Sequence, residues 1–223
     1  MRKFSRNRVC TWEKILEQGA VELGISLNSR QLDIMSFHGN ELVKWNKKFN
    51  ITSITDPCEI ALKHFIDCLA LVSYVPDNAK VLDLGSGGGF PGFPLKTAKP
   101  SVDLMMIDAS RKKISFLNYL IRTLGMTGAH AVHARCEDLS EDENFKHKFD
   151  CVVSRAFTSL DRFIVLSLPF LSENGFMLAM KGQQSEKEIQ QSLQKEKFCI
   201  KNNNYTLPVG GYNRSIIKIK PLI

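Results

Sequence analysis

The sequence lacks a long apolar run: no stretch of 18 consecutive apolar residues occurs in its 223 residues, so no membrane-spanning helix is expected. Its six cysteines include no Cys-x-x-Cys pair, which argues against a disulfide framework or a zinc site. His130 and His133 flank an expected strand without further metal ligands beside them. The basic N-terminus continues without the apolar core of a signal peptide. These absences predict a cytoplasmic protein with reduced, buried thiols, no metal site and no membrane contact.

Charge is unevenly distributed along the chain. Residues 1–50 hold nine Lys/Arg and five Asp/Glu, residues 51–180 hold thirteen and fifteen, and residues 181–223 hold eight and three. The net charge of +7 therefore comes from the two ends. Basic ends around a nearly neutral middle suit a polyanionic partner such as RNA. Ordinary solubilising charge is the alternative explanation.

A glycine-rich turn is the most informative motif. Residues 81–92 read Val-Leu-Asp-Leu-Gly-Ser-Gly-Gly-Gly-Phe-Pro-Gly, an apolar strand and a turn before an expected helix. Gly85, Gly87 and Gly89 have no Cβ, so a ligand can approach the backbone closely. Asp83 would repel a phosphate but suits a cationic ligand that carries an ammonium group. The pattern predicts a pocket for S-adenosylmethionine, and a nucleotide-binding or purely structural turn is the alternative.

A second acid, Asp108, ends the apolar run of residues 102–108, 25 residues beyond Asp83. An acid at the end of the second strand of a βαβ unit can accept two hydrogen bonds from a ribose diol. It could also cap the helix expected after it, although Ser110 could serve as that cap instead. We favour the ribose role, and both roles can coexist.

Apolar periodicity divides the chain into two parts. Helical patterns fill residues 1–79, with Gly39 weakening one helix and Asp56-Pro57 starting another. From residue 80 strands and helices alternate, which predicts an α/β fold: a doubly wound, mostly parallel, Rossmann-like sheet with an N-terminal helical extension packed on it. Residues 80–223 would form the methyltransferase domain. We expect strands at 80–84, 102–107, 129–133, 149–153, 175–181, 197–203 and 215–220, and helices at 91–98, 111–124, 159–168 and 184–196. The last two strands are candidates for an antiparallel hairpin.

The chain resembles the glucose-inhibited division protein B family, also called RsmG. The resemblance covers roughly residues 45 to 183, most of a domain. It begins at Trp45-Asn-Lys-Lys-Phe-Asn-Ile-Thr-Ser-Ile and includes His64-Phe-Ile-Asp-Cys-Leu, Arg135-Cys-Glu-Asp, Ser154-Arg-Ala-Phe and Lys181-Gly-Gln. The loop from Gly85 to Pro94 is its most specific part, because its paired prolines are absent from methyltransferases in general. At Gly88 many members have proline or alanine. The resemblance implies a class I S-adenosylmethionine-dependent methyltransferase that acts on guanine N7 in bacterial small-subunit (16S) ribosomal RNA.

The family pattern also assigns residues to roles. It implies that Gly85 and Phe90 line the cofactor pocket beside Asp83, Gly87 and Asp108, and that Cys136 and Glu137 flank the adenine. Arg155 is the candidate catalytic residue, facing the transfer site, and it is also a candidate cofactor-binding residue. Arg135, Lys181 and Arg214 are the candidate RNA contacts. The expected partner is small-subunit rRNA or the small ribosomal subunit, and the expected state is a monomer.

Methylation of guanine N7 sets modest chemical demands. N7 carries a free lone pair at neutral pH, so no general base is required and catalysis rests on alignment. The ring becomes cationic, so we assign Arg155 to guanine O6, a phosphate or the cofactor carboxylate; a structural ion pair is the alternative. No Asn/Asp-Pro-Pro-aromatic tetrad occurs, which argues against methylation of an exocyclic amine. A methyltransferase of a small molecule or protein, or a regulator that senses S-adenosylmethionine, are the competing functions.

Overall fold

The computed structural model describes residues 11–182, 185–194 and 196–222. Its strands are β1 (Lys80–Leu84), β2 (Asp103–Asp108), β3 (Ala129–His133), β4 (Phe149–Arg155), β5 (Leu171–Lys181), β6 (Phe198–Thr206) and β7 (Asn213–Pro221). Its α-helices are α1 (Trp12–Glu22), α2 (Ser29–Phe49), α3 (Pro57–Ile60), α4 (Asp67–Leu69), α5 (Gly92–Ala98), α6 (Arg111–Leu124), α7 (Cys136–Leu139), α8 (Leu160–Ser167) and α9 (Ser185–Gln191). A π-helical segment, η1 (Ala61–Ile66), and two 3₁₀ turns, η2 (Val72–Tyr74) and η3 (Leu168–Phe170), complete it.

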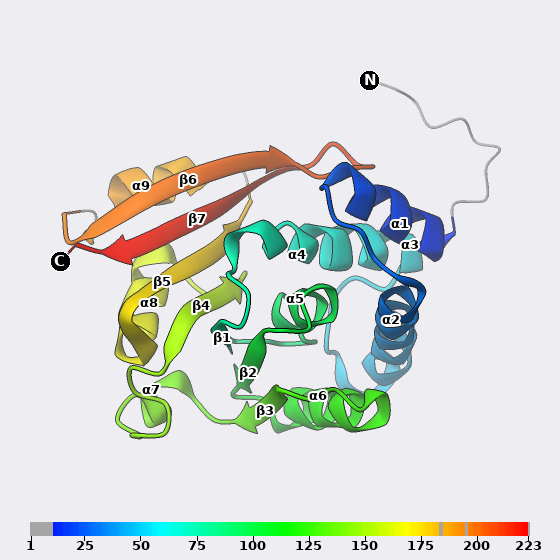
Figure 1. Cartoon of the computed structure of the whole chain (residues 1–223), viewed down its shortest axis with the longest axis horizontal. Coiled ribbons are helices and arrows are strands. Elements are labelled where there is room, and N and C mark those ends of the chain that lie inside the picture. The colour runs from blue at the N-terminus through cyan, green and yellow to red at the C-terminus, as the bar shows by residue number, and fades with distance from the viewer. Residues whose placement is uncertain (1–10, 183–184, 195, 223) are drawn as a thin grey trace.

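The strands form one seven-stranded sheet in the order β3-β2-β1-β4-β5-β7-β6 (Figure 1). The first five strands are parallel, whereas β7 runs antiparallel to both β5 and β6. The predicted fold class and the predicted C-terminal hairpin are therefore confirmed. Strand order reverses between β1 and β4, and ligands of open α/β sheets bind at such a point, beyond the carboxyl ends of the strands.

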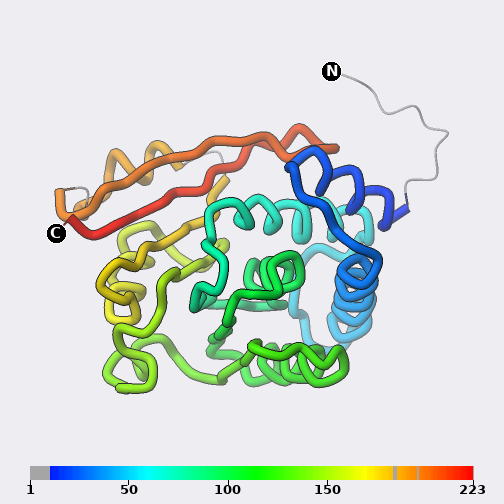
Figure 2. The backbone as a smooth tube through the Cα atoms, in the orientation of Figure 1, coloured from blue at the N-terminus to red at the C-terminus, as the bar shows by residue number. Residues whose placement is uncertain are grey.

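Helices cover both faces of the sheet (Figure 2). Side chains of α1, α2, the 57–69 helix, α5 and α6 share one apolar core with the sheet face that carries Val81. Side chains of α7 and α8 form a second core on the face that carries Leu82. Parallel strands covered on both faces are apolar throughout, which explains why β1 reads as a nearly continuous apolar run.

Several predicted boundaries shift. Strand β5 begins at Leu171 rather than at residue 175, and the helix predicted over 184–196 is formed at Ser185–Gln191, with residues 184 and 195 outside the described part. The short helix α7 was not predicted. The prediction of buried thiols is wrong for Cys199, which is exposed and free, whereas Cys68, Cys136 and Cys151 are buried. No helix in the described residues is long and apolar enough to cross a membrane.

The two first helices pack closely because of Gly39. A Cβ at Gly39 would lie 2.5 Å from the Trp12 ring, whose indole nitrogen donates to Ser36 Oγ at 3.0 Å. Glycine therefore lets α1 approach α2, and α2 continues without a break through the position where the sequence suggested weakness. Asn28 starts α2 with a capping box to Gln31.

The helix over residues 57–69 positions part of the site. Asp56 caps it by accepting from the Glu59 N–H, and Pro57 occupies its first turn, as predicted. Its middle is the π-helical segment η1, flanked by α3 and α4. Such segments are rare and occur often at functional sites. The apolar periodicity of the sequence did not predict this π-helical segment.

The division into an extension (1–79) and a domain (80–223) remains a prediction that unfolding can test. Leu16 of α1 is fully buried in the core that it shares with the sheet. We expect Leu16→Ala to lower the free energy of unfolding by about 2–5 kcal/mol, because it leaves a cavity. The loss should appear in a single transition measured by circular dichroism and fluorescence.

The matched control is Val21→Ala on the same helix, since Val21 is 71% exposed and its truncation should change stability little. Two separate transitions, of which only the first moves in Leu16→Ala, would show that the extension unfolds independently of the sheet.

Candidate active site

The glycine-rich turn leads from β1 to α5 and lies beside the end of β2. The N–H groups of Gly85 and Ser86 both donate to the Ile107 carbonyl, at 2.9 and 3.0 Å. Gly85 and Gly87 have φ values of +70° and +57°, which side-chain-bearing residues rarely adopt. At Gly87 a Cβ would have no neighbour closer than the Gly85 carbonyl at 3.9 Å, so the backbone there is accessible from one side.

Asp83 lies beneath this turn rather than on its surface. Its side chain is fully buried, and its Oδ2 accepts from the Gly92 N–H at 2.8 Å, at the start of α5. Its Oδ1 has no hydrogen-bond partner among the described residues. Burial raises the pKa of this carboxyl to about 7, against the opposing effects of the Gly92 N–H and Arg155. The carboxylate is thus held in place but only half satisfied.

Asp108 joins the turn to the end of β2. Its Oδ2 accepts from the Gly87 N–H at 2.9 Å, and its Oδ1 accepts from the Ser110 N–H at 2.7 Å. Ser110 holds the cap position of α6 without a side-chain cap bond. The structure therefore brings Asp108 beside the glycine-rich turn, where it also shapes the approach to the helix.

Cys136 and Glu137 open α7 just beyond β3. Cys136 is buried, and the pKa of its thiol is raised to about 11, chiefly by burial and further by the charges of Glu137 and Asp108. Glu137 forms an ion pair with Arg162 of α8. Arg135 is exposed at the cap of the same helix and lies away from the residues of the basic pocket defined below.

Phe90 lies inside the protein, under the turn. Its ring stacks between His38, at 4.9 Å between centroids, and His64, at 4.6 Å. The guanidinium of Arg155 lies 5.2 Å from the same ring. Phe90 is only 5% exposed, so in this conformation it supports the turn from the core and offers little surface to a ligand.

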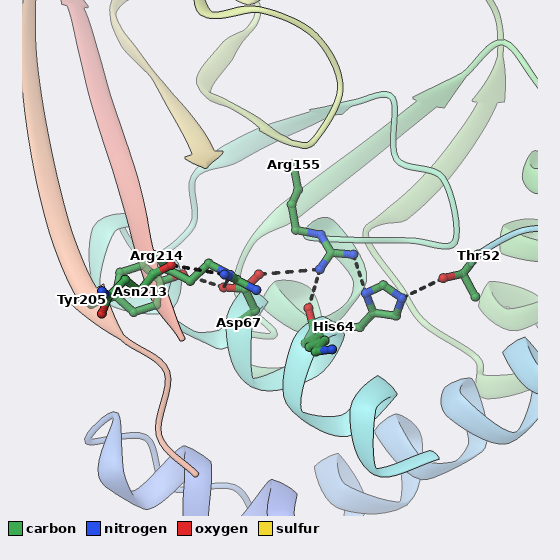
Figure 3. Close-up of polar contacts among 8 residues, drawn as sticks. Thr52, His64, Asp67, Arg155, Tyr205, Asn213 and Arg214 are labelled. Carbon is green, nitrogen blue, oxygen red and sulfur yellow. Dashed lines mark hydrogen bonds and ion pairs between the residues drawn. The ribbon is translucent and has the colours of Figure 1, made fainter. Parts of the chain in front are cut away.

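Arg155, at the end of β4, is held by several partners (Figure 3). One terminal nitrogen donates to the Lys63 carbonyl and the other to His64 Nδ1, both at 2.6 Å. The first also lies 3.7 Å from Asp67 Oδ2. The ion pair that the sequence left open as an alternative is therefore present, although it does not use every N–H of the guanidinium.

His64 positions Arg155 and stays neutral. Because its Nδ1 accepts from Arg155, its Nε2–H must donate to Thr52 Oγ1, 2.9 Å away. Burial first, and the Arg155 charge second, lower the pKa of His64 to about 3. The role of this histidine was not evident from the sequence.

Asp67 connects Arg155 with the C-terminal hairpin. Its Oδ1 accepts from the Tyr205 hydroxyl at 2.7 Å and lies 3.6 Å from Arg214 Nε (Figure 3). Burial, followed by the Asp67 charge, raises the pKa of Tyr205, so the phenol stays protonated. Residues from α4, β4 and the β6–β7 hairpin thus meet at one carboxylate.

A pocket of about 400 Å³ opens above this network; we call it the basic pocket. Four cations and one acid line it, together with a neutral histidine: Lys63, Arg155, Lys181, Arg214, Asp67 and His64. Lys181 is fixed by the Thr158 carbonyl at 2.7 Å and by Glu188 at 2.8 Å. Three of the predicted site residues, Arg155, Lys181 and Arg214, therefore come together, whereas sequence reasoning missed Lys63 and Asp67.

The basic pocket adjoins the glycine-rich turn through Phe157, which sequence reasoning also missed. A Cβ at Gly85 would overlap the Phe157 ring, so the two are in contact. Ala156, between Arg155 and Phe157, has a φ of +51°, an uncommon conformation that turns the chain sharply at the end of β4. The aromatic residue after Ser154-Arg-Ala was the available signal.

Comparison with known proteins gives consistent results. Residues 31–217 match the family described as rRNA small subunit methyltransferase G. The ribosomal RNA small subunit methyltransferase G of Geobacter sp. (strain M21) is 39% identical over 213 residues, 93% of this chain and 96% of that protein. The protein of the same name from Streptococcus thermophilus (strain CNRZ 1066) is 38% identical over 207 residues, 89% and 87% of the two chains.

Solved structures share the fold at low sequence identity. A SAM dependent methyltransferase from Aquifex aeolicus superposes with a TM-score of 0.56 at 13% identity, covering 76% of this chain and 96% of that one. A ribosomal protein L11 methylase from Lactobacillus delbrueckii subsp. bulgaricus gives 0.54 at 16% identity, with 72% and 79% covered. These similarities confirm the class I methyltransferase fold.

The raised pKa of Asp83 predicts how the free energy of unfolding depends on pH. The folded protein keeps a proton on this carboxyl up to about pH 7, whereas the unfolded chain releases it near pH 3.8. The native state binds more protons between these values, so this group lowers the free energy of unfolding as pH rises from about 4 to 7. We expect Asp83→Asn to remove that loss and to stabilise the ligand-free protein at pH 8, by up to about 4 kcal/mol.

The measurement is the difference in urea unfolding between wild type and Asp83→Asn across pH 4–8, which cancels the titration of His38 and His64. Glu143→Gln, at an exposed position, removes the same charge as a control. A difference that is negative at pH 8 and independent of pH would contradict the assignment.

Proposed function

The chain belongs to the rRNA small subunit methyltransferase G family, and from this premise we propose that it transfers the methyl group of S-adenosylmethionine to N7 of a guanine in small-subunit (16S) ribosomal RNA. The observation that carries the proposal is the position of the basic pocket. It opens at the carboxyl ends of β4 and β5, in contact with the glycine-rich turn through the Arg155–Phe157 segment. A cofactor site and a site for an anionic substrate are thereby adjacent.

The residues of the turn suit S-adenosylmethionine. The backbone at Gly87 is open, and Asp108 lies beside it. Asp83 offers a buried carboxylate oxygen that has no partner among the residues the structure describes. A cationic ligand nearby would favour the ionised form of Asp83, which phosphate would not. Cys136 and Glu137 remain our candidates for the adenine side, with Gly85 and Phe90 shaping the turn. When bound, S-adenosylmethionine supplies an electrophilic methyl group on its sulfonium.

The basic pocket suits a nucleophile that needs no deprotonation. Both ring nitrogens of His64 are engaged, and Asp67 is committed to Tyr205 and two arginines. Neither is free to act as a general base, and guanine N7 requires none. What these residues provide is orientation of the acceptor.

Arg155 is the residue we propose to contact the substrate, at guanine O6 or at a phosphate. Its charge would disfavour a cationic methylated ring, but Asp67 lies 3.7 Å from it and offsets part of that charge. Lys181 and Arg214 on the pocket rim are proposed RNA contacts, and exposed Arg135 is a more remote one. A cytoplasmic, monomeric enzyme acting on rRNA or on the small subunit belongs to the same proposal.

Methyl transfer tests the proposal directly. The protein is incubated with S-adenosylmethionine carrying a labelled methyl group, together with small subunits or naked rRNA from a strain that lacks this gene. The RNA is digested to nucleosides and analysed by mass spectrometry. Labelled 7-methylguanosine is expected. Absence of label from RNA, with cofactor binding verified by calorimetry, would transfer the assignment to another acceptor or to a cofactor sensor.

Arg155 should matter more for turnover than for folding. We expect Arg155→Ala to lower kcat by about 10²-fold or more, because an aligned charged donor is lost, while cofactor affinity changes little. Arg155→Lys keeps the charge near Asp67 but loses the planar fork, so it should recover stability without recovering kcat. If both variants are largely unfolded by circular dichroism, or if Arg155→Lys restores full turnover, Arg155 is only a structural partner of Asp67.

A further inference from the structure

The C-terminal hairpin places three lysines on one face. Along β7, Ile217 and Ile219 are buried in the core that contains α8. Lys218 and Lys220 alternate with these isoleucines, so their side chains lie on the opposite face of the sheet. On β6, Lys201 pairs directly with Lys218, which places both side chains on the same face. We call Lys201, Lys218 and Lys220 the lysine face.

Electrostatics within the fold does not explain this arrangement. Like charges directly opposite each other on neighbouring strands destabilise a sheet. Residues 197–223 contain no Asp or Glu, and no lysine of the face has an ion-pair partner within 4.0 Å among the described residues. The three positive charges are therefore left to interact with an anion from outside the chain.

The lysine face is ordered rather than splayed into solvent. The Lys218 amine lies 4.2 Å from the centre of the Phe176 ring on β5, a cation–π contact that fixes its direction. Lys201, opposite it on β6, and Lys220, two residues farther along β7, are exposed. The three lysines therefore cluster positive charge at this edge of the sheet.

The same face of β7 carries a cation of the basic pocket, although Ile216, between Lys218 and that cation, is fully buried. Arg214 lies four residues before Lys218 on β7, so its side chain shares that face, and it lines the pocket beside Arg155. From Lys220 to Arg214 the strand spans about 20 Å at roughly 3.4 Å per residue. In Figure 1 this path follows β7 from its end near the C-terminus toward α4.

We propose that the lysine face binds the phosphodiester backbone of the RNA segment that leads to the target guanine, with Arg214 as the last cation before the basic pocket. The inference rests on the proposed function, which it deepens. RNA backbone is the occupant that the chemistry favours, because the face offers three cations and residues 197–223 contain no acid. Contacts of this kind fix register and orientation and carry no sequence information.

The test is the triple variant Lys201→Gln, Lys218→Gln, Lys220→Gln. Binding to naked small-subunit rRNA is measured by filter retention across a series of salt concentrations. Each phosphate contact contributes about 0.7–1 to the slope of log affinity against log salt, so the slope should fall by about 2–3. The KM for RNA should rise at least tenfold, while kcat at saturating RNA and calorimetric cofactor affinity stay near wild type.

The matched control is Lys14→Gln, Lys80→Gln, Lys148→Gln, which removes the same charge from exposed positions that do not belong to the hairpin. An unchanged salt slope in the hairpin variant, or an equal fall in both variants, overturns the proposal. So does a loss of binding to assembled small subunits with naked RNA unaffected, which would indicate an acidic protein surface as the partner.

These outcomes are separable from failure of the proposed function. If wild type transfers no methyl group to RNA but binds it with a salt slope that the hairpin variant reduces, the lysine face stands and the reaction is wrong. If wild type forms 7-methylguanosine and the hairpin variant matches it in binding and KM, the reaction stands and the lysine face is wrong.

Discussion

One buried carboxylate, that of Asp67, holds together the parts of the chain that form the site. It lies between Arg155 and Arg214 and accepts the Tyr205 hydroxyl, so α4, β4 and the C-terminal hairpin meet at a single group. Replacing Asp67 would leave both arginines without their shared counter-charge, at a cost of about 3–5 kcal/mol. The basic pocket therefore exists only when segments far apart in the sequence have all assembled.

The two buried carboxylates of the site differ in how many hydrogen-bond and ion-pair partners they have. Asp67 has three partners of its own, whereas within the described part of the chain Asp83 has only the Gly92 N–H, and one of its oxygens has no partner there. The fold thus satisfies the carboxylate of the proposed substrate side internally and leaves that of the proposed cofactor side incomplete. A cation bound there would add to the stability of the whole chain, because anything that binds only the native state stabilises it. Incomplete satisfaction of a buried group is a common property of functional sites.

Local sequence signals predicted the sheet, the succession of strands and helices along the chain, the glycine-rich turn and the hairpin. These features could be predicted because apolar runs and glycine spacing are patterns of a few neighbouring residues. The family resemblance, rather than these local signals, indicated Arg155, Lys181 and Arg214. What they missed depends on contacts between distant segments: the burial of Phe90 between two histidines, the tautomer of His64, and the pairing of Lys201 with Lys218. Gly39 shows the limit clearly, since it weakens a helix locally yet permits the approach of Trp12.

The π-helical segment η1 has a consequence for how this protein can change over evolution. Both the Lys63 carbonyl and His64 that hold Arg155 come from this wide turn. Deleting one residue there would restore ordinary α-helical winding and shift the Lys63 carbonyl and His64 relative to Arg155. The core could repack with apolar residues of similar size, but the arginine would lose its partners. In relatives of this chain, the length of the segment should therefore tolerate even less variation than the identity of its residues.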